Sequence, residues 1–257
     1  MKVDLVLDNL EAIKHNLCQG NYLREDIDDI YLELIMLYNS IDLYSVENDS
    51  EIALIYHMVI EFLDYCYIIS NCSLLPLAMA NSSLRRNRLV GVDKFMLYCT
   101  FHADEADGKK YTPSLSIWDN KNKYYCYGCY CEGNIIDYIC ASENLDEAKA
   151  MMLLAKIFLL FPVSEDDFDY KIVLKYRKSI LSAEYLEFLV RERKKFESLS
   201  EEEKQRHLPK MANVDKQINN INRIRAGIVD SNFIPINDFK YLVGEDEDKD
   251  KMNLFII

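Results

Sequence analysis

The chain has 257 residues, of which half are hydrophobic and only 7 are Gly and 5 are Pro, so it can bury a sizeable core in one or two domains and is not a disordered tail. Its net charge of -13 at pH 7 argues against a protein that coats nucleic acid without sequence preference, because phosphate binding is driven largely by Lys and Arg. The first residues place acids inside every apolar stretch, unlike a secretory signal or a transit peptide, so we expect a cytoplasmic protein.

The N-terminal region, residues 1–82, is predicted to be helical. Apolar residues recur with the spacing of one helix face over 3–18, 27–41 and 51–69, which predicts three helices packed as a compact bundle. Such stripes are typical of core packing, and no catalytic pattern occurs among them.

The longest apolar run, Ile52 to Ile69, has the length of a short membrane span. It contains His57, Glu61 and Asp64, and charged groups at mid-span are costly in lipid. We therefore interpret the run as a buried helix and expect no membrane partner.

Charge is distributed unevenly along the chain. Residues 1–82 carry 3 basic and 14 acidic side chains, residues 83–131 carry 8 and 5, and residues 132–257 carry 19 and 24. Residues 83–131, the only net-positive segment, also lose the helical periodicity and bring Gly and Pro beside short alternating runs. This pattern indicates strands and turns.

Four soft metal ligands occur in two short pairs in this β region. Cys99 and His102 are followed, after 23 residues, by Cys126 and Cys129, and each pair can place two donors one short turn apart on a metal ion. Four nitrogen and sulfur donors suit tetrahedral Zn²⁺, and a site closed by protein ligands is structural. The alternative, unligated buried cysteines, is disfavoured by this spacing.

A fifth donor, Cys131, lies two residues after Cys129 and could compete for the metal. Reaching the ion from that position would need a different turn from the one that Gly128 supports, so we treat Cys131 as a spare. The remaining cysteines lie among apolar residues, where a thiol behaves as a small hydrophobe, and we assign them no role. They are Cys18, Cys66, Cys72 and Cys140.

The residues around the four ligands resemble the Cys-His-Cys-Cys zinc-binding domain, a zinc ribbon, of DnaG-type bacterial DNA primases. The resemblance covers about 95–160. Its matching runs are Cys99-Thr-Phe-His102, Thr112-Pro-Ser-Leu115, Cys126-Tyr-Gly-Cys129, Gly133-Asn-Ile-Ile-Asp-Tyr138, Glu147-Ala148 and Leu154-Ala155. The resemblance implies a module that binds Zn²⁺ and single-stranded template DNA and helps to choose where a primer starts.

The chain departs from this family pattern in two places. Thr100 stands where the family has Pro, and the stretch from His102 to Thr112 is longer than usual. The extra residues include acids that would weaken phosphate contact if they lay on a binding face: Asp104, Glu105 and Asp107.

The fold class that we expect is α+β, a mainly helical chain with a small central antiparallel zinc ribbon. We divide the chain into an N-terminal helical region at 1–82 and a primase-like zinc ribbon with its following helices at 83–161. A C-terminal helical region with an acidic tail takes up 162–257. Within that region Ser200 and Glu203 form a candidate capping box, and Gly227 is a candidate helix stop.

A hairpin turn at 119–122 would place Trp118 opposite Lys123 and Ser116 opposite Tyr125. One face of the hairpin is then apolar, and the other is an aromatic and basic surface on which unpaired bases could stack. Two alternatives remain: the aromatics could pack under a helix, and a slip of one residue would exchange one strand's faces. The candidate nucleic-acid-binding residues of the hairpin are Trp118, Lys123, Tyr125 and Tyr127.

A basic run just before the ribbon adds three further candidates for phosphate contact, Arg85, Arg86 and Arg88. A solvated turn is an equally good interpretation of this run.

No catalytic residue is recognisable. A primase needs carboxylates that hold metal ions for nucleotidyl transfer, and the two D-x-D runs, Asp167 to Asp169 and Asp246 to Asp248, lie in a helical stretch and in the acidic tail. The sequence therefore favours a zinc-dependent DNA-binding protein in the replication of DNA or of a mobile element, with a helicase or polymerase as candidate partner. A divergent catalytic primase and a zinc-stapled protein-interaction adaptor remain as alternatives.

Overall fold

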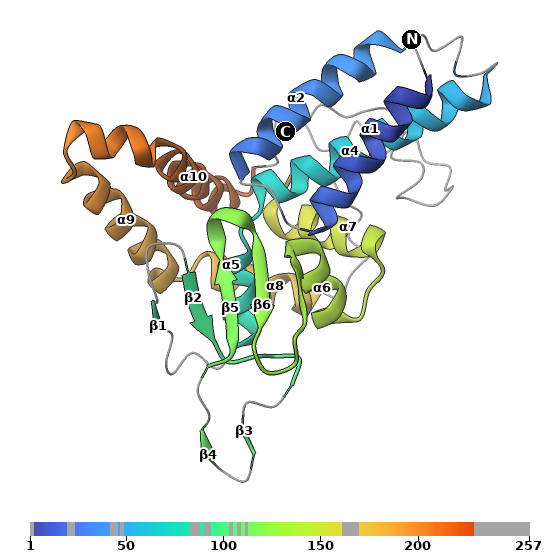
Figure 1. Ribbon diagram of the computed structural model, residues 1–257. Coiled ribbons are helices and arrows are strands. Elements are labelled where there is room, and N and C mark those ends of the chain that lie inside the picture. The colour runs from blue at the N-terminus through green and yellow to red at the C-terminus, as the bar shows by residue number, and fades with distance from the viewer. Residues whose placement is uncertain are drawn as a thin grey trace.

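The computed structural model describes residues 3–19, 24–41, 46, 49–82, 88–89, 94–102, 105–106, 109–110, 113–160 and 170–228. Helices form at both ends of this part of the chain, and a small antiparallel sheet lies between them (Figure 1). This arrangement confirms the expected fold class, a mainly helical α+β chain.

The three predicted N-terminal helices are present. They are α1 (Val3–Gln19), α2 (Arg24–Ser40) and α4 (Ser50–Asn71). Asp49 caps α4, since its carboxylate accepts hydrogen bonds from the backbone N–H groups of Glu51 and Ile52, which would otherwise lack partners.

Helix α4 is the core helix of this region and packs against both α1 and α2. It is long and apolar enough to cross a membrane by length and composition, and 61% of its most apolar window is buried inside the protein. The interpretation of 52–69 as a buried helix is therefore confirmed. A short helix, α5 (Leu74–Asn81), follows directly.

The central sheet has five strands in the order β1-β2-β5-β6-β7, all antiparallel. Its strands are β1 (Arg88–Leu89), β2 (Lys94–Leu97), β5 (Leu115–Trp118), β6 (Lys123–Cys126) and β7 (Glu132–Asn134). A second, two-stranded sheet, β3 (Glu105–Ala106) with β4 (Lys109–Lys110), extends away from the body (Figure 1). It occupies the stretch in which the sequence is longer than the family pattern.

Within the part of the chain that the structure describes, helices cover one face of the central sheet. Helices α5 and α8 lie behind the sheet in Figure 1, and α6 flanks β6. Along β5 and β6 the residues that face these helices are fully or almost fully buried: Leu115, Ile117, Tyr124 and Cys126. The opposite face, which we call the outer face, has no helix over it among the described residues.

The turn between β5 and β6 is the single turn of 3-10 helix η1 (Asp119–Lys121) followed by Asn122 in the left-handed conformation. It docks on the junction of α4 and α5. Asp119 accepts hydrogen bonds from the Ser73 hydroxyl (2.6 Å) and the Leu75 N–H (3.4 Å), so it caps α5 from outside that helix.

Asn122 completes the docking. Its side-chain amide donates to the carbonyls of Ile69 (2.6 Å) and Cys72 (2.9 Å) and accepts from the Leu74 N–H (2.9 Å). This end of the hairpin is thereby fixed to the helical core.

The C-terminal half continues with helices, and both predicted end signals are confirmed. The helices are α6 (Ile135–Glu143), α7 (Glu147–Phe158), α8 (Tyr170–Ile180), α9 (Ala183–Glu197) and α10 (Glu201–Ala226). Ser200 and Glu203 form the capping box of α10, and Gly227 ends that helix in the left-handed conformation.

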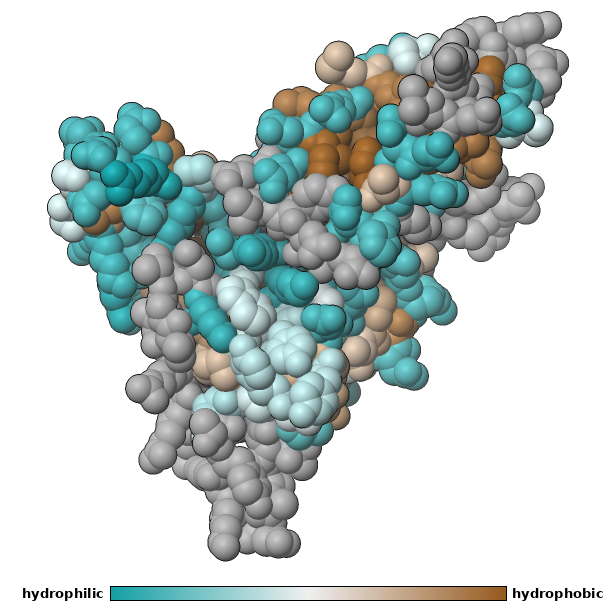
Figure 2. Space-filling view, in the orientation of Figure 1, coloured by the Kyte–Doolittle hydropathy of each residue, from teal (hydrophilic) through white to brown (hydrophobic). Residues whose placement is uncertain are grey.

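Two helical arms diverge from the sheet, one built by α9 and α10 and the other by α1, α2 and α4, and the space-filling outline is accordingly V-shaped (Figure 2). A single hydrophobic core runs from Leu10 through the sheet to Ile224. The division into three domains stays a prediction, and the core continues across both predicted boundaries.

Candidate metal centre and outer face

Two backbone knuckles place the predicted ligands at the lower end of the sheet. Cys99 follows β2, and Cys126 ends β6. The Phe101 N–H donates to the Cys99 sulfur (3.3 Å), and the Gly128 and Cys129 N–H groups donate to the Cys126 sulfur (3.3 and 3.5 Å). Such N–H donors stabilise the thiolate form, which is the form that binds metal.

The ring of His102 lies against the second knuckle. Its Nδ1 is 3.7 Å from the Cys126 sulfur. A Cβ atom added at Gly128 would come within 2.4 Å of His102 Nε2 and 2.6 Å of Cε1. Glycine is therefore required at 128 so that the ring can approach the cysteines.

The separations of these donors fit one tetrahedral zinc ion. Two thiolates on such an ion, each about 2.3 Å from it, lie about 3.8 Å apart, and a thiolate and an imidazole nitrogen about 3.6 Å apart. The Cys99 and Cys129 sulfurs are 3.9 Å apart, and the Cys126 sulfur is 3.7 Å from His102 Nδ1. The donor set Cys99, His102, Cys126 and Cys129 stays a prediction, and the geometry is compatible with it.

Cys131 joins the same cluster. The sulfurs of Cys99, Cys126, Cys129 and Cys131 all lie within 4.8 Å of one another, which is a grouping able to hold a metal ion. The different turn that Cys131 needs in order to reach the cluster is provided by Tyr130, whose φ of 61° is left-handed. The Cys129 and Cys131 sulfurs are only 3.0 Å apart, closer than two ligands of one tetrahedral zinc.

The two buried thiols titrate differently. Burial raises the pKa of the Cys99 thiol to about 12 against the lowering effect of its backbone hydrogen bonds. Burial acts in the same direction on Cys126, but hydrogen bonds from Ser114, Cys129 and Gly128 outweigh it and lower the pKa of that thiol to about 7. Cys126 is thus the thiol of this pair that ionises more readily.

An aromatic cluster supports the knuckles from the core side. The rings of Phe101, Tyr124 and Tyr138 lie with centroids 5.3 to 5.6 Å apart. The hydroxyl of Thr100, at the position where the primase pattern has Pro, lies 3.5 Å from the Tyr138 hydroxyl. The first knuckle is therefore packed against α6.

The outer face carries the predicted aromatic and basic residues. Trp118 is opposite Lys123 and Ser116 is opposite Tyr125, so the predicted register is confirmed. Figure 2 shows pale, weakly polar side chains gathered over the sheet. The Tyr125 and Tyr127 rings are 5.0 Å apart, and Tyr127 is 52% exposed.

Lys94 extends this face and was missed by the sequence analysis. The Lys94 ammonium lies 5.0 Å from the centre of the Trp118 ring and 5.1 Å from that of Tyr127, whose hydroxyl accepts its hydrogen bond (3.0 Å). This bond lowers the pKa of Tyr127. The alternation of 94–97, in which Phe95 and Leu97 are the buried residues, was the sequence signal for the outward direction of Lys94.

The remaining predicted contacts and the two acidic runs are mostly beyond what the structure describes. Arg85, Arg86 and the runs 167–169 and 246–248 lie outside the described residues. The backbone of Arg88 lies in β1, opposite Met96.

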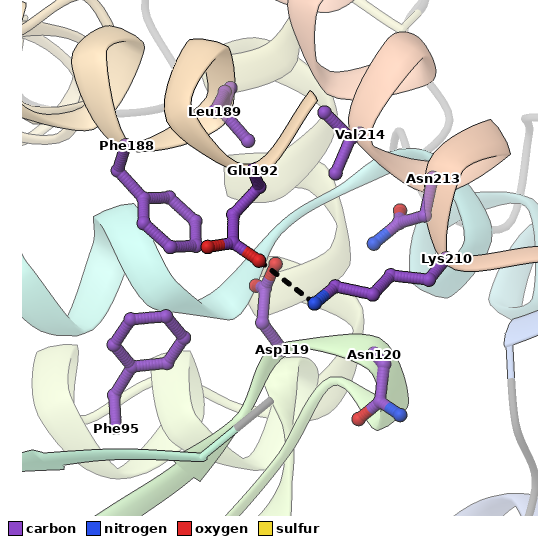
Figure 3. A pocket seen from close by; sticks show the side chains of 9 residues that line it. All are labelled: Phe95, Asp119, Asn120, Phe188, Leu189, Glu192, Lys210, Asn213 and Val214. Atoms are coloured by element: carbon purple, nitrogen blue, oxygen red, sulfur yellow. Dashed lines mark hydrogen bonds and ion pairs between the residues drawn. The ribbon is translucent and has the colours of Figure 1, made fainter. Parts of the chain in front are cut away.

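A small pocket lies where α9 and α10 meet the sheet, lined in part by Asp119 and Glu192 (Figure 3). Glu192 is buried and paired with Lys195 (2.6 Å) and Lys210 (2.9 Å). Glu192 thereby links α9 to α10, and Asp119 is occupied by its hydrogen bonds at the start of α5. Both carboxylates of the pocket thus have structural partners.

Comparison with known proteins agrees with the geometry of the centre. Residues 81–168 match the family model of the CHC2 zinc finger. The chain is 33% identical over 86 residues to a DNA primase of Buchnera aphidicola subsp. Acyrthosiphon pisum. This stretch is 34% of the present chain and 14% of that primase.

Two further DNA primases match shorter stretches. One from Buchnera aphidicola subsp. Baizongia pistaciae is 37% identical over 60 residues, and one from Pseudomonas putida is 36% identical over 58 residues; each stretch is 23% of this chain and 9% or 8% of the relative. The chain thus spans no more than 14% of the length of these relatives. No solved structure matches it.

Proposed function

We propose that the chain, which carries a CHC2 zinc finger over 81–168, is a zinc-dependent module that binds single-stranded DNA during replication. The observation that carries the proposal is the outer face. It is a sheet surface with no described helix over it, and it carries two tyrosine rings in edge-to-face contact and two lysines. It adjoins a cluster of four cysteines, beside which the His102 ring lies.

Zinc, when bound, supplies a fixed link between the two knuckles and no open position for catalysis. The protein's own residues then perform the binding. Trp118, Tyr125 and Tyr127 offer ring faces to unpaired bases, each stack contributing about 1–3 kcal/mol. Lys94 and Lys123 contact the phosphates, which is a charge effect that depends on salt.

The matching primases support a role at the template in the cytoplasm. Since the match covers a small part of each relative, we propose template recognition for this chain and leave primer synthesis to a polymerase partner, with a helicase as the other candidate partner. A primer-synthesis assay with the isolated protein, Mg²⁺ or Mn²⁺ and a single-stranded template should give no product. Templated synthesis would support the divergent primase instead.

The direct test is fluorescence anisotropy with a labelled single-stranded oligonucleotide at low and physiological salt. Trp118→Ala and Tyr125→Ala should each weaken binding by about 1–3 kcal/mol without loss of zinc, because each removes one stack. Lys123→Ala should weaken binding to all sequences alike and reduce its salt dependence, because it removes one phosphate contact.

Matched controls lie on α8, behind the sheet. Tyr170 is 65% exposed and Lys178 is exposed, so Tyr170→Ala and Lys178→Ala should leave DNA binding unchanged. Equal effects of the control and outer-face variants would contradict the proposed location.

The adaptor remains a second candidate because the helical arm exposes large apolar side chains. Leu32 and Met36 on α2 are 59% and 72% exposed, and Leu54 on α4 is 50% exposed. Absence of any DNA binding at low salt, in protein that holds zinc, would favour this candidate.

A further inference from the structure

The metal centre holds one donor more than a tetrahedral ion uses, and the surplus donor has a specific neighbour. The sulfurs of Cys129 and Cys131 are 3.0 Å apart. This separation is longer than the bond of a disulfide, about 2.05 Å. It is shorter than the distance between two thiolates on one zinc, about 3.8 Å. The geometry is therefore that of two thiols poised beside each other.

The backbone is shaped to hold this pair. Tyr130, between the two cysteines, takes the left-handed conformation with φ 61°, which costs a non-glycine residue on the order of 1–3 kcal/mol unless surrounding structure fixes it. Two hydrogen bonds supply that structure: the Tyr130 N–H donates to the Cys126 carbonyl (3.0 Å), and the Cys126 N–H donates to the Cys131 carbonyl (2.9 Å).

The pair is also the accessible half of the cluster. Cys99 and Cys126 are only 8% and 0% exposed, whereas Cys129 is exposed and Cys131 partly so. A small oxidant in solvent therefore reaches Cys129 and Cys131 before the two buried sulfurs.

We propose that Cys129 and Cys131 form a modification site at which a peroxide converts two thiols into a disulfide and so removes Cys129 from the metal. The peroxide transfers one oxygen to the Cys129 sulfur and leaves as water, giving a sulfenic acid. The Cys131 sulfur then displaces that oxygen as a second water, and the two sulfurs are joined with the loss of two electrons and two hydrogens overall. The proposal rests on the metal assignment of the proposed function, since Cys99, His102 and Cys126 alone would hold the ion less tightly.

The test uses the full-length, zinc-loaded chain treated with hydrogen peroxide. Zinc release is followed with a chromogenic chelator, and the peptide spanning 129–131 is examined by mass spectrometry for the loss of two hydrogens. The wild type should release zinc and regain it after a thiol reductant and Zn²⁺ are added. Cys131→Ser should hold zinc when untreated and release it several-fold more slowly.

Cys140→Ser is the matched control, because Cys140 is partly buried on α6 and outside the cluster; it should behave as the wild type. Equal release from wild type and Cys131→Ser with no disulfide at 129–131 would overturn the proposal. A Cys131→Ser protein that binds no zinc would also overturn it, by showing Cys131 to be a ligand. If untreated wild type holds no zinc, the metal assignment fails, whereas the mass measurement still tests the disulfide.

Discussion

Gly128 is the residue on which the approach of His102 to the cysteines depends. In Gly128→Ala the new methyl group would overlap the His102 ring, at 2.4 Å from Nε2, so the ring must move away from the Cys126 sulfur. We expect the variant to bind zinc at least about tenfold more weakly, measured by competition with a chromogenic chelator, since one of the four predicted ligands is displaced.

Gly227→Ala provides the comparison. Gly227 has no atom within 4 Å of its added Cβ, so this variant carries only the backbone strain of a left-handed alanine. If Gly128→Ala binds zinc as tightly as the wild type does, His102 is not a ligand.

Asp64 is a buried acid in α4, 8% exposed, and burial raises its pKa to about 7. The folded state therefore retains a proton that the unfolded state has lost between about pH 4 and about pH 7, and the free energy of unfolding falls as pH rises through this window. Asp64→Asn removes the cost of the buried charge and should stabilise the protein by on the order of 3 kcal/mol at neutral pH and by little near about pH 4.

Urea unfolding at several pH values would measure this difference. Glu61→Gln, an exposed acid on the same helix, should give no gain that grows with pH. A constant difference between Asp64→Asn and wild type across the window would contradict the assignment.

At the scale of elements, the hairpin turn is a structural joint between the sheet and the helical core. Asn122 is fully buried, makes three hydrogen bonds to the α4–α5 junction and has φ 48°. Asn122→Ala should lower the free energy of unfolding by about 2–4 kcal/mol, because it leaves buried backbone groups unpaired and places alanine in the left-handed region.

Asn120 lies two residues earlier in the same turn, and its side-chain oxygen has no hydrogen-bond partner. Asn120→Ala should therefore change the free energy of unfolding by less than about 1 kcal/mol. Urea melts of the two variants would compare them, and equal losses would mean that the turn does not hold the sheet through Asn122.

The elements that could be predicted from sequence are those set by local periodicity and spacing. The helices over 3–18, 27–41 and 51–69, the capping box at Ser200 and the pairing of Trp118 with Lys123 follow from patterns within a few turns of chain, and all are confirmed. Cys131 was expected to be a spare because reaching the cluster from that position needs a special turn. The left-handed Tyr130 provides that turn, and it could not be predicted because a left-handed tyrosine has no sequence signature.

Contacts between distant segments could not be predicted. Asp119 was expected as an ordinary turn residue, whereas its carboxylate caps a helix 44 to 46 residues earlier in the chain. Lys94 was likewise missed as a member of the outer face, because its place beside Trp118 depends on the pairing of β2 with β5.

At the scale of the whole molecule, one hydrophobic core joins the sheet that carries the cysteine cluster to both helical arms. Most of that core lies in helices that contain no predicted metal ligand. Removal of zinc by a chelator should therefore alter the sheet first, since the folding free energy of a zinc ribbon comes largely from its metal. The helical signal in circular dichroism should largely remain.

Trp118 is the chain's single tryptophan and lies on the sheet, so its fluorescence reports the ribbon separately from the helices. Chelator already saturated with zinc is the control and should change neither signal. If the tryptophan fluorescence changes and the helical signal is lost at the same chelator concentration, the metal holds the whole core together.

The hairpin of β5 and β6 is held at both ends, by the cysteine cluster around Cys126 at one end and by the side-chain amide of Asn122 at the other. Because neither end is free to open, the backbone amide hydrogens of the two strands should exchange slowly with deuterium along the whole hairpin. Once the metal is removed, exchange should advance from Cys126 towards Asn122, and in Asn122→Ala it should advance in the opposite direction. The direction in which amide exchange spreads along the hairpin therefore shows which of its two ends has been released.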